Sequence, residues 1–347
     1  MEEEYHYVGF DIHKKTIALC VMDERGHIKD QRSIRSTPAS LKYWLTHEAP
    51  RRWKGGMEAT LFTDWVYDVM HEYNEDIEVG NPMALKYISS MKRKNDRLDA
   101  KKMANLLRCD MFPGIHMLSK EMRMLRRLVR YRNFVVREIT RFKNYTTTQL
   151  MGLGIEYNSR KIHGKKYFAR LLKEVEIPEE ALHILTMDRH AIDFLQGVER
   201  GIKRRLLSNE ALCARLHRLL TIPGVGLITA LSWSLEVGDP HRFPSLNKAV
   251  SYCGLCSAER ESGGKVRRGP LSKHRNKHLQ WVLLEASKLG VQHNPRLAEV
   301  YEKTYRHHNH NAATIAVARR MAAFLLALDK RNTVYDPAHS CSPPIKG

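Results

Sequence analysis

The middle of the chain carries a long stretch with a helical hydrophobic repeat, and this stretch constrains the fold most. Within residues 119–149 the recurring positions step by three and four residues, and five of the six are apolar: Leu125, Leu128, Arg132, Val135, Ile139 and Phe142. Such spacing predicts one long helix with an apolar seam. Glycines at 152 and 154 end it, and a second helical series follows over residues 165–220. The two predict an antiparallel pair or an arm that meets a second subunit, although an ordinary amphipathic core helix explains the seam alone.

The chain is strongly basic, both in this stretch and overall. Residues 119–149 contain nine lysines and arginines against two glutamates, and the whole chain of 347 residues has 58 against 38 acidic residues, a net charge of +20. This excess disfavours an enzyme for small neutral substrates. It indicates a polyanionic partner, because neutralised phosphates release counterions and thereby drive binding. A basic protein without such a partner is the alternative.

Three further features predict a protein of the reducing cytoplasm. The N-terminus, residues 1–5, is acidic and polar, unlike a secretory signal. The longest apolar run, residues 227–235, falls short of the roughly 20 residues that span a bilayer, so no membrane partner is expected. The six cysteines are spread over the whole length, which is not typical of a disulfide framework.

The first hundred residues alternate between strand-like and helix-like periods. Short apolar runs bounded by turns predict strands at residues 7–12, 16–22, 27–33, 55–59 and 77–79. Helices are predicted at residues 41–48, from residue 63 onward and at residues 96–108. A strand hairpin followed by alternating strands and helices predicts a mixed α/β sheet.

Four carboxylates are expected at one edge of this sheet. Asp11 ends the first strand and Glu58 ends a later one. Asp96 and Asp99 stand three residues apart on a predicted helix, so they share one face. Four converging carboxylates suit two Mg²⁺ ions about 4 Å apart, which can act on both sides of a phosphoryl transfer. Taken singly, each acid is better explained as an ordinary surface residue.

Basic residues surround the helical pair of acids and predict the path of a bound polyanion. They are Lys92, Arg93, Lys94, Arg97, Lys101 and Lys102.

The last third of the chain opens with a glycine-rich turn, residues 222–226, before an apolar segment that starts at 227. This pattern resembles a helix-hairpin-helix element, in which Gly224 and Gly226 form a tight turn and the free N–H groups of the next helix contact a DNA phosphate. A plain turn before a buried helix is the alternative. Two further helices are expected, at residues 277–289 and 312–329.

Between the turn and those helices lies a basic, glycine-rich segment that carries a serine. Ser262 precedes two glycines, where backbone can approach a phosphate closely. The cations expected to bind phosphate there are Lys265, Arg267, Arg268, Lys273 and Arg275. Ser262 could attack phosphorus as a nucleophile; a flexible basic loop without chemistry is the alternative, and Ser272 and Ser257 are weaker rivals.

Cys253 and Cys256 have the spacing of zinc ligands, and three histidines lie downstream at 307, 308 and 310. A zinc site needs about four such ligands. Buried thiols explain the lone pair better.

Motifs in both halves resemble one family, the DEDD transposases. Residues 7–13 (YVGFDIH), 56–60 (GMEAT) and 93–100 (RKNDRLDA) resemble its N-terminal domain. The resemblance implies a RuvC-like fold related to ribonuclease H, with Asp11, Glu58, Asp96 and Asp99 as metal ligands.

The C-terminal motifs of the family match in order. They are Gly254-Leu255, Ser262-Gly263 and Ser272-Lys273-His274-Arg275-Asn276. By this match Ser262 is the nucleophile of the family. Ser257 stands where proline is usual, which leaves the serine in register.

Over residues 5–330 the chain thus resembles the DEDD/serine transposases of bridge-RNA-guided insertion sequences. The expected fold is α/β plus α: a RuvC/ribonuclease H-like mixed sheet with helices, a helical coiled-coil arm, and a mostly helical C-terminal domain with a helix-hairpin-helix. The expected domains are residues 1–110 (catalytic), 111–215 (arm and linker) and 216–330 (transposase domain with the serine), followed by a disordered tail at 331–347.

The resemblance also implies a mechanism and partners. The chain would be an RNA-guided DNA transposase or recombinase that cuts and rejoins donor and target DNA through a serine–phosphate intermediate, assisted by Mg²⁺. Its partners would be both DNAs, a structured non-coding bridge RNA and further copies of itself, as a dimer or tetramer in which the acids of one subunit meet Ser262 of another. It would act in a prokaryotic cytoplasm, at the nucleoid when bound.

Two other functions stay open at this point. One is a metal-dependent nuclease of the Holliday-junction type, in which water attacks and Ser262 has no role. The other is a non-catalytic nucleic-acid-binding protein, in which the acids are structural.

Overall fold

The computed structural model describes the backbone of residues 4–88, 95–262 and 265–337, and their side chains except those of residues 87, 259–261 and 265–268. The chain forms two compact units, Met1–Lys120 and Glu121–Gly347. The finer boundaries expected at residues 110, 215 and 330 stay predictions. Each unit is described by itself below.

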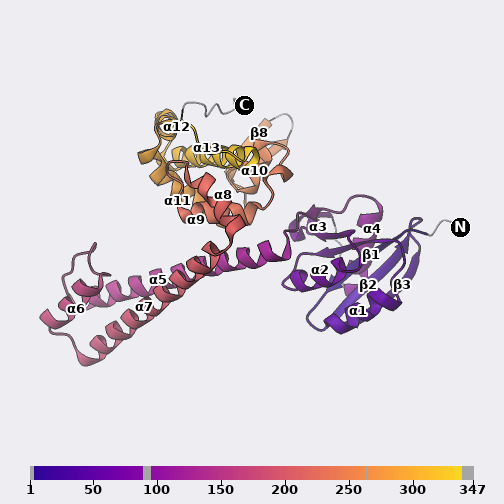
Figure 1. The fold of residues 1–347 in the computed structure, drawn as a ribbon, viewed down its shortest axis with the longest axis horizontal. Coiled ribbons are helices and arrows are strands. Elements are labelled where there is room, and N and C mark those ends of the chain that lie inside the picture. The colour runs from indigo at the N-terminus through magenta and orange to yellow at the C-terminus, as the bar shows by residue number, and fades with distance from the viewer. Residues whose placement is uncertain (1–3, 89–94, 263–264, 338–347) are drawn as a thin grey trace. The chain divides into compact units, whose positions relative to one another are not determined.

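Unit one is built on a six-stranded mixed sheet with the strand order β3-β2-β1-β4-β5-β6. Its strands are β1 (His6–Ile12), β2 (Thr16–Asp23), β3 (Ile28–Arg35), β4 (Trp53–Glu58), β5 (Ile77–Gly80) and β6 (Gly114–Ile115). The central strand β1 pairs antiparallel with β2 and parallel with β4, and β5 continues the parallel part. The predicted mixed α/β sheet and the first hairpin are confirmed (Figure 1).

Helices cover both faces of this sheet. They are α1 (Pro38–His47), α2 (Thr63–His71), α3 (Pro82–Ile88) and α4 (Asp96–Arg108). On one face Phe10 and Met57 pack with Trp44 of α1 and Val66 of α2 in the main core. Because side chains alternate along a strand, the other residues of β1 and β4 face the opposite side, where α4 packs against β1 and β2.

The approach of α4 to the sheet depends on a glycine. A Cβ added to Gly9 would lie 2.0 Å from the Ala100 carbonyl oxygen and 2.6 Å from the Ala104 nitrogen. These are backbone atoms, so only a residue without a Cβ lets the helix lie directly on β1. The first turn of α4 is thereby held next to the end of β1.

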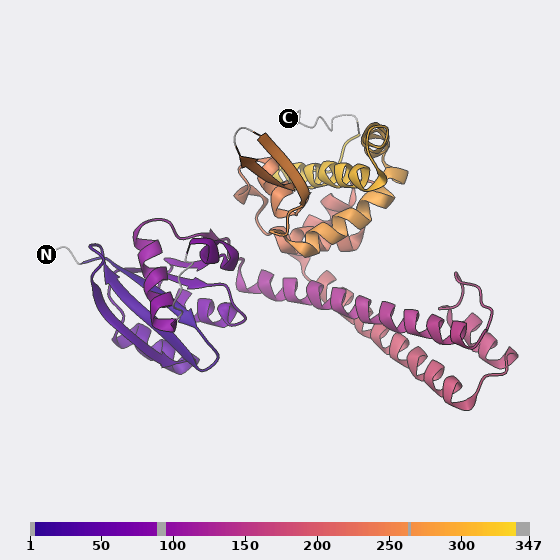
Figure 2. The same cartoon turned by 180° about the vertical axis from the view of Figure 1, so that it is seen from behind.

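Unit two begins with three helices: α5 (Lys120–Gly152), α6 (Lys165–Glu174) and α7 (Glu179–Leu207). The helices α5 and α7 lie side by side in both views (Figure 1, Figure 2). Arg132 pairs with Glu199, and Thr146, further along α5, donates to Asp188, which is earlier on α7. The two helices therefore run antiparallel, one of the two arrangements expected from the seam, and seam residues such as Val135 are buried in the core of unit two.

The remainder of unit two is a helical bundle with one small hairpin. Its elements are α8 (Glu210–Leu220), α9 (Leu227–Val237), η1 (Pro240–Arg242), α10 (Leu246–Tyr252), β7 (Ser257–Ser262), β8 (Lys265–Leu271), α11 (Lys277–His293), α12 (Pro295–Tyr305) and α13 (His310–Arg331). The mostly helical C-terminal part agrees with the expectation. The β7–β8 pair lies in a segment expected to be a loop, and neither this pair nor α12 was predicted.

By length and composition, α13 is the one helix in the described part of the chain that could cross a membrane. The helix expected at residues 312–329 is present, and Arg319 and Arg320 interrupt its apolar residues. Most of its residues are buried, and it packs against α11 and α12. Burial of this kind is typical of the core helix of a bundle.

Candidate active site

The strand ends of the sheet place two of the expected acids on the same face. Phe10 pairs with Met57 at the last parallel position of β1 and β4, and Asp11 and Glu58 follow one residue later on the two strands. Because Phe10 and Met57 point into the core with α1 and α2, the next residues point to the α4 side. Asp11 and Glu58 therefore stand at neighbouring register positions beneath α4.

The first turn of α4 supplies the other two acids. The Asn95 side chain caps the helix by accepting a hydrogen bond from the Arg97 N–H at 3.1 Å, so the helix begins at Asp96. Asp96 and Asp99 then lie in the first turn, where the free N–H groups and the helix dipole favour negative charge. The contact of α4 with Gly9 brings this turn to the end of β1.

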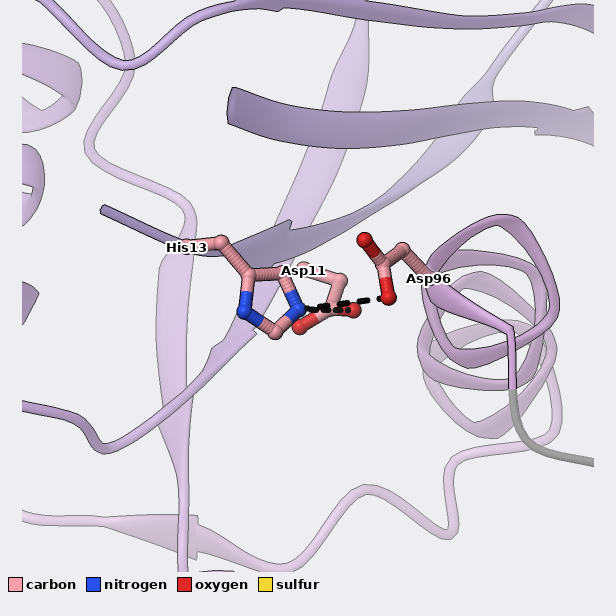
Figure 3. Close-up of side chains that lie close together, drawn as sticks. All are labelled: Asp11, His13 and Asp96. Carbon is pink, nitrogen blue, oxygen red and sulfur yellow. Dashed lines mark hydrogen bonds and ion pairs between the residues drawn. The ribbon is translucent and has the colours of Figure 1, made fainter. Parts of the chain in front are cut away.

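A histidine joins the acids of the two elements (Figure 3). His13 Nε2 lies 3.1 Å from Asp11 Oδ2 and 3.4 Å from Asp96 Oδ1. The backbone N–H of His13 donates to the Thr16 carbonyl at 2.8 Å, which closes the β1–β2 turn and fixes the residue. His13 was part of the matched motif but was not singled out as a site residue. Its position two residues after Asp11, on the same strand face, was the available signal.

The surroundings of Asp11 disfavour the charged form of its carboxyl. Burial raises the pKa of the Asp11 carboxyl, and the neighbouring Asp96 and Asp99 raise it further, while His13 opposes both effects. The Asp11 side chain is 15% exposed, whereas that of Asp96 is 57% exposed. A positive charge placed here would stabilise the ionised form of Asp11.

The four acids are not brought together equally. Asp11 and Asp96 belong to one group with His13, whose possible ligand atoms all lie within 4.8 Å of one another. Asp99 is near enough to affect Asp11 but forms an ion pair with Lys102 Nζ at 2.7 Å. Glu58 is placed by its register and is half-buried.

This donor set suits a hard divalent cation. Carboxylate oxygens are the ligands that Mg²⁺ prefers, and two of them already face one another across β1 and α4. Asp11 and Asp96 could hold the ion, and the further candidates are Asp99, which affects the charge of Asp11, and Glu58, which is placed by its strand register. The imidazole of His13 adds a nitrogen, which Mn²⁺ accepts more readily than Mg²⁺ does.

Of the basic residues expected beside the acids, Arg97 is exposed on the first turn of α4, and its carbonyl accepts from Gln31 Nε2 at 2.8 Å. Lys92, Arg93 and Lys94 lie outside the described residues. Their binding of nucleic acid stays a prediction.

Ser262 is the last residue of β7 and is exposed. It pairs in register with Lys265 across the tip of the hairpin. The side chains of Lys265, Arg267 and Arg268 are outside the described part, while Lys273 and Arg275 are exposed just after β8. The expected loop is therefore a two-stranded ribbon that presents Ser262 at its end.

The glycines of the 222–226 turn have different surroundings. Gly224 has φ +92° and a Cβ there would lie 2.4 Å from the Gly290 Cα, so this glycine lets the turn pack on α11. Gly226 precedes α9, and a Cβ there would meet no atom within 4 Å. Gly224 thus has a packing role of its own, and Gly226 is the more open position for a ligand.

The cysteine pair lacks the surroundings of a zinc site. Burial raises the pKa of the Cys253 thiol to about 12, which disfavours the thiolate that binds metal. Within the described residues, no group of three metal-binding side chains includes Cys253 or Cys256.

Comparison with known proteins gives matches to both halves of the chain. A DEDD transposase family model matches residues 8–154, and the model described as the IS116/IS110/IS902 transposase family matches residues 216–302. The transposase of insertion sequence IS1328 of Yersinia enterocolitica is 27% identical, over 70% of this chain and 73% of that protein. The IS1111A transposase of Coxiella burnetii is 25% identical, over 94% of this chain and 90% of that protein.

A probable family 20 transposase of Pseudomonas aeruginosa is 23% identical over 95% of this chain and 98% of its own length. The matched regions include the acids of unit one and Ser262 of unit two. With its ribonuclease H-like sheet and its acidic group, the chain belongs to the IS110-type family of DEDD transposases. Proteins of this class cut and rejoin DNA.

Proposed function

We propose that the chain is an RNA-guided DNA recombinase in which a magnesium-binding acidic site and a nucleophilic serine act in one reaction. The observation that carries this proposal is that His13 contacts both Asp11 and Asp96. Asp96 is brought there by α4, which packs closely on β1 because of Gly9. A structural acid would be expected to have a lowered pKa from a cationic partner, whereas burial and the carboxylates of Asp96 and Asp99 raise the pKa of Asp11 despite its contact with His13.

Asp11 and Asp96 hold the divalent cation in this proposal, and Glu58 and Asp99 complete the ligand set. When bound, the cation supplies positive charge at the phosphate under attack. The acids of unit one would thereby also help to position the DNA, because a phosphate that is not neutralised by a cation would be repelled by them. Arg97 and the neighbouring lysines and arginines contact the flanking phosphates.

Ser262 is the nucleophile. Its Oγ forms a bond to phosphorus, the bond from phosphorus to one deoxyribose oxygen breaks, and the serine proton is lost as the departing oxygen gains one. One phosphate ester thus replaces another. A hydroxyl of the other DNA then attacks the phosphoserine, which rejoins the strands and restores the serine. The exposure of Ser262 at the hairpin end supports access to a duplex.

The basic arm and the net charge of +20 support a partner with more phosphate than one duplex. We assign this to the structured RNA, which pairs with donor and target DNA, and to the two DNAs. The acids of one subunit and Ser262 of another form the composite site in a dimer or tetramer.

Three variants of the full-length chain test this function, assayed with the non-coding RNA of the element and duplexes that carry its junction and insertion site. Ser262→Ala abolishes both the protein–DNA adduct and joining, and Asp11→Asn does the same, while the control Ser272→Ala retains both. A Ser262→Ala protein that still cleaves DNA at the wild-type rate indicates a nuclease that uses water. An Asp11→Asn protein with unchanged activity indicates that the acids are structural.

A further inference from the structure

A buried carboxylate lies at the base of the hairpin that carries Ser262. Glu236, near the end of α9, has a side chain with 0% exposure. Arg130 on α5 donates to both of its oxygens, from Nε to Oε1 and from Nη2 to Oε2, each at 2.6 Å. Bidentate, charge-assisted pairs of this kind fix geometry as well as charge.

The same glutamate contacts both ends of the hairpin. Tyr252, the last residue of α10 before β7, donates its hydroxyl to the Glu236 carbonyl at 2.9 Å. Asn276, which follows β8, donates Nδ2 to Glu236 Oε2 at 2.8 Å. The Asn276 N–H also donates to the Tyr252 carbonyl at 3.0 Å, so the entering and leaving segments are tied to each other as well.

Asn276 has no hydrogen-bonding capacity left for another purpose. Its Oδ1 accepts from the N–H groups of His278 and Leu279 and so caps α11. Its Nδ2 contacts Tyr252 Oη at 3.3 Å besides Glu236. One side chain, that of Asn276, therefore links the end of the hairpin to the start of α11 and to the buried carboxylate.

Two further bonds hold the stem of the hairpin on the bundle, and a third joins the two arms of the stem to each other. Gln280 Nε2 of α11 donates to the Gly254 carbonyl at 2.6 Å, and Arg319 Nε of α13 donates to the Leu255 carbonyl at 2.7 Å. Ser272 N–H donates to the Cys256 carbonyl at 3.0 Å where the two strands meet the bundle. Ser262 lies at the far end of the ribbon, so a small tilt of this stem displaces its hydroxyl.

Glu236 is ionised in this environment. Burial alone would raise the pKa of its carboxyl, but Arg130, Asn276 and Arg126 together hold it below the usual value. The negative charge of the Glu236 carboxylate strengthens the hydrogen bonds that Arg130 and Asn276 donate to it. No step of the proposed reaction uses this group, which lies inside the bundle.

We propose that Glu236 is a positioning residue for Ser262: with Arg130 and Asn276 it fixes the stem of the serine hairpin on the bundle and on α5. The inference rests on the proposed role of Ser262. Arg130 belongs to the arm helix, so a movement of the arm relative to the bundle would change the hairpin stem first. The Glu236 side chain is fully buried and therefore acts through its neighbours.

The variant that tests this is Glu236→Gln, which keeps the shape of the side chain and removes its charge. Glu285→Gln is the matched control, because Glu285 is half-exposed on α11 and pairs only with Lys288 among the described contacts. Arg130→Gln is the second variant in case Glu236→Gln does not fold, since the Arg130 side chain is 41% exposed and tolerates change more readily. The double variant Arg130→Gln/Glu236→Gln restores a neutral, matched pair.

Three measurements are made on each full-length protein. Hydrogen exchange followed by mass spectrometry, without DNA or RNA, reports the order of residues 255–272. Single-turnover adduct formation, at saturating DNA and RNA, reports the placement of the serine, and DNA affinity is measured separately.

We expect Glu236→Gln and Arg130→Gln to speed exchange in the hairpin while the helices of unit two stay protected. Adduct formation should slow by about 10²-fold, the usual effect of misplacing a reacting group by about 1 Å, with DNA affinity unchanged. The double variant should regain part of both, and Glu285→Gln should match the wild type.

The inference is wrong if the hairpin of both variants exchanges as slowly as that of the control, or if exchange rises equally in all helices of unit two, which would mean a general role in stability. If the wild-type protein forms no adduct, the proposed function fails, and the exchange data still decide whether Glu236 orders the hairpin.

Discussion

Asp11 and Glu236 are both carboxylates within folded units, and their surroundings differ in sign. Asp11 faces Asp96 and Asp99, and His13 opposes their effect; the pKa of Asp11 is raised, mainly by burial. Glu236 is more deeply buried, yet Arg130, Asn276 and Arg126 together hold its pKa below the usual value. Burial and neighbouring carboxylates oppose the charge of Asp11, whereas neighbouring cations stabilise the charge of Glu236.

The difference distinguishes a site that binds a ligand from an ion pair that fixes segments of the protein. Like charges that are kept together by the fold cost free energy until a ligand neutralises them, as expected for metal ligands. A buried ion pair with all hydrogen bonds made has no such need, and it fixes the segments that supply its members. The comparison therefore assigns chemistry to unit one's acids and positioning to Glu236.

The largest effect is expected from Asp11→Asn. Loss of a cation ligand should lower the rate of DNA cleavage by on the order of 10³-fold, because the charge at the reacting phosphate is worth several kcal/mol. In EDTA the variant should melt at a higher temperature than the wild type, since the cost of burying the Asp11 charge is gone, together with its repulsion by Asp96 and Asp99. Added Mg²⁺ should raise the melting temperature of the wild type only.

Asp110→Asn is the control for this experiment. Asp110 is exposed after α4 with φ 53°, a conformation that asparagine also adopts. A wild-type response to Mg²⁺ in Asp11→Asn would show that the ion binds elsewhere.

The next effect concerns the helix that brings the acids together. Gly9→Ala should lower the free energy of unfolding of unit one by about 3 kcal/mol, because the new Cβ meets the backbone of α4. Cleavage activity should fall as well, even at temperatures where the variant is folded, since Asp96 moves away from Asp11. Urea unfolding and a cleavage assay measure the two.

Gly201→Ala serves as its counterpart in unit two, where a Cβ would meet no atom within 4 Å. This change should stabilise α7 by roughly 0.5–1 kcal/mol through helix propensity and leave activity unchanged. Equal stability of Gly9→Ala and the wild type would contradict the close packing of α4 on β1.

The smallest effect is a pH dependence of opposite sign at the two carboxylates. The folded pKa of Glu236 is lowered, so its stabilisation is complete above the unfolded value of about 4.5 and is lost as pH falls toward the folded pKa. The folded pKa of Asp11 is raised, so its ionisation costs stability at neutral pH and the cost disappears as pH falls through that pKa.

Urea midpoints between pH 7 and pH 3 measure both effects. The wild type should be more stable than Glu236→Gln at neutral pH and should lose that advantage in acid. It should be less stable than Asp11→Asn at neutral pH in EDTA and should recover in acid. Parallel curves for the three proteins would remove the distinction between the two carboxylates.

The sequence predicted unit one well because its signals are local. The apolar runs placed β1, β2 and β4, with Asp11 next to the last residue of β1 and Glu58 as the last residue of β4. Asn95 marks the start of α4 as an N-cap, which sets the acids at 96 and 99 in its first turn. The positions of the acids on their strands and helix could therefore be predicted from the sequence, whereas the distances between them could not.

Features that depend on distant residues were missed. Glu236 stands in an apolar helix, and its partner Arg130 is 106 residues away in sequence, so no local pattern connects them. The strands of the hairpin lack the usual alternation of polar and apolar residues, because charged residues stand at many positions. Hydrogen bonds from the helical bundle hold the stem of the hairpin in place. At α12, the Asn294-Pro295 pair reads as a helix break, but Asn294 both ends α11 and caps the next helix.

The central claim is that the acids of unit one and Ser262 act in one reaction. The most direct test is to quench a reaction of the full-length protein with its RNA and both DNAs, digest the protein and locate covalently bound DNA by mass spectrometry. We predict a phosphodiester-linked nucleotide on the peptide that contains Ser262, present with Mg²⁺ and absent with EDTA or in Asp11→Asn. Cleaved DNA without any adduct, or an adduct on another residue, would contradict the account.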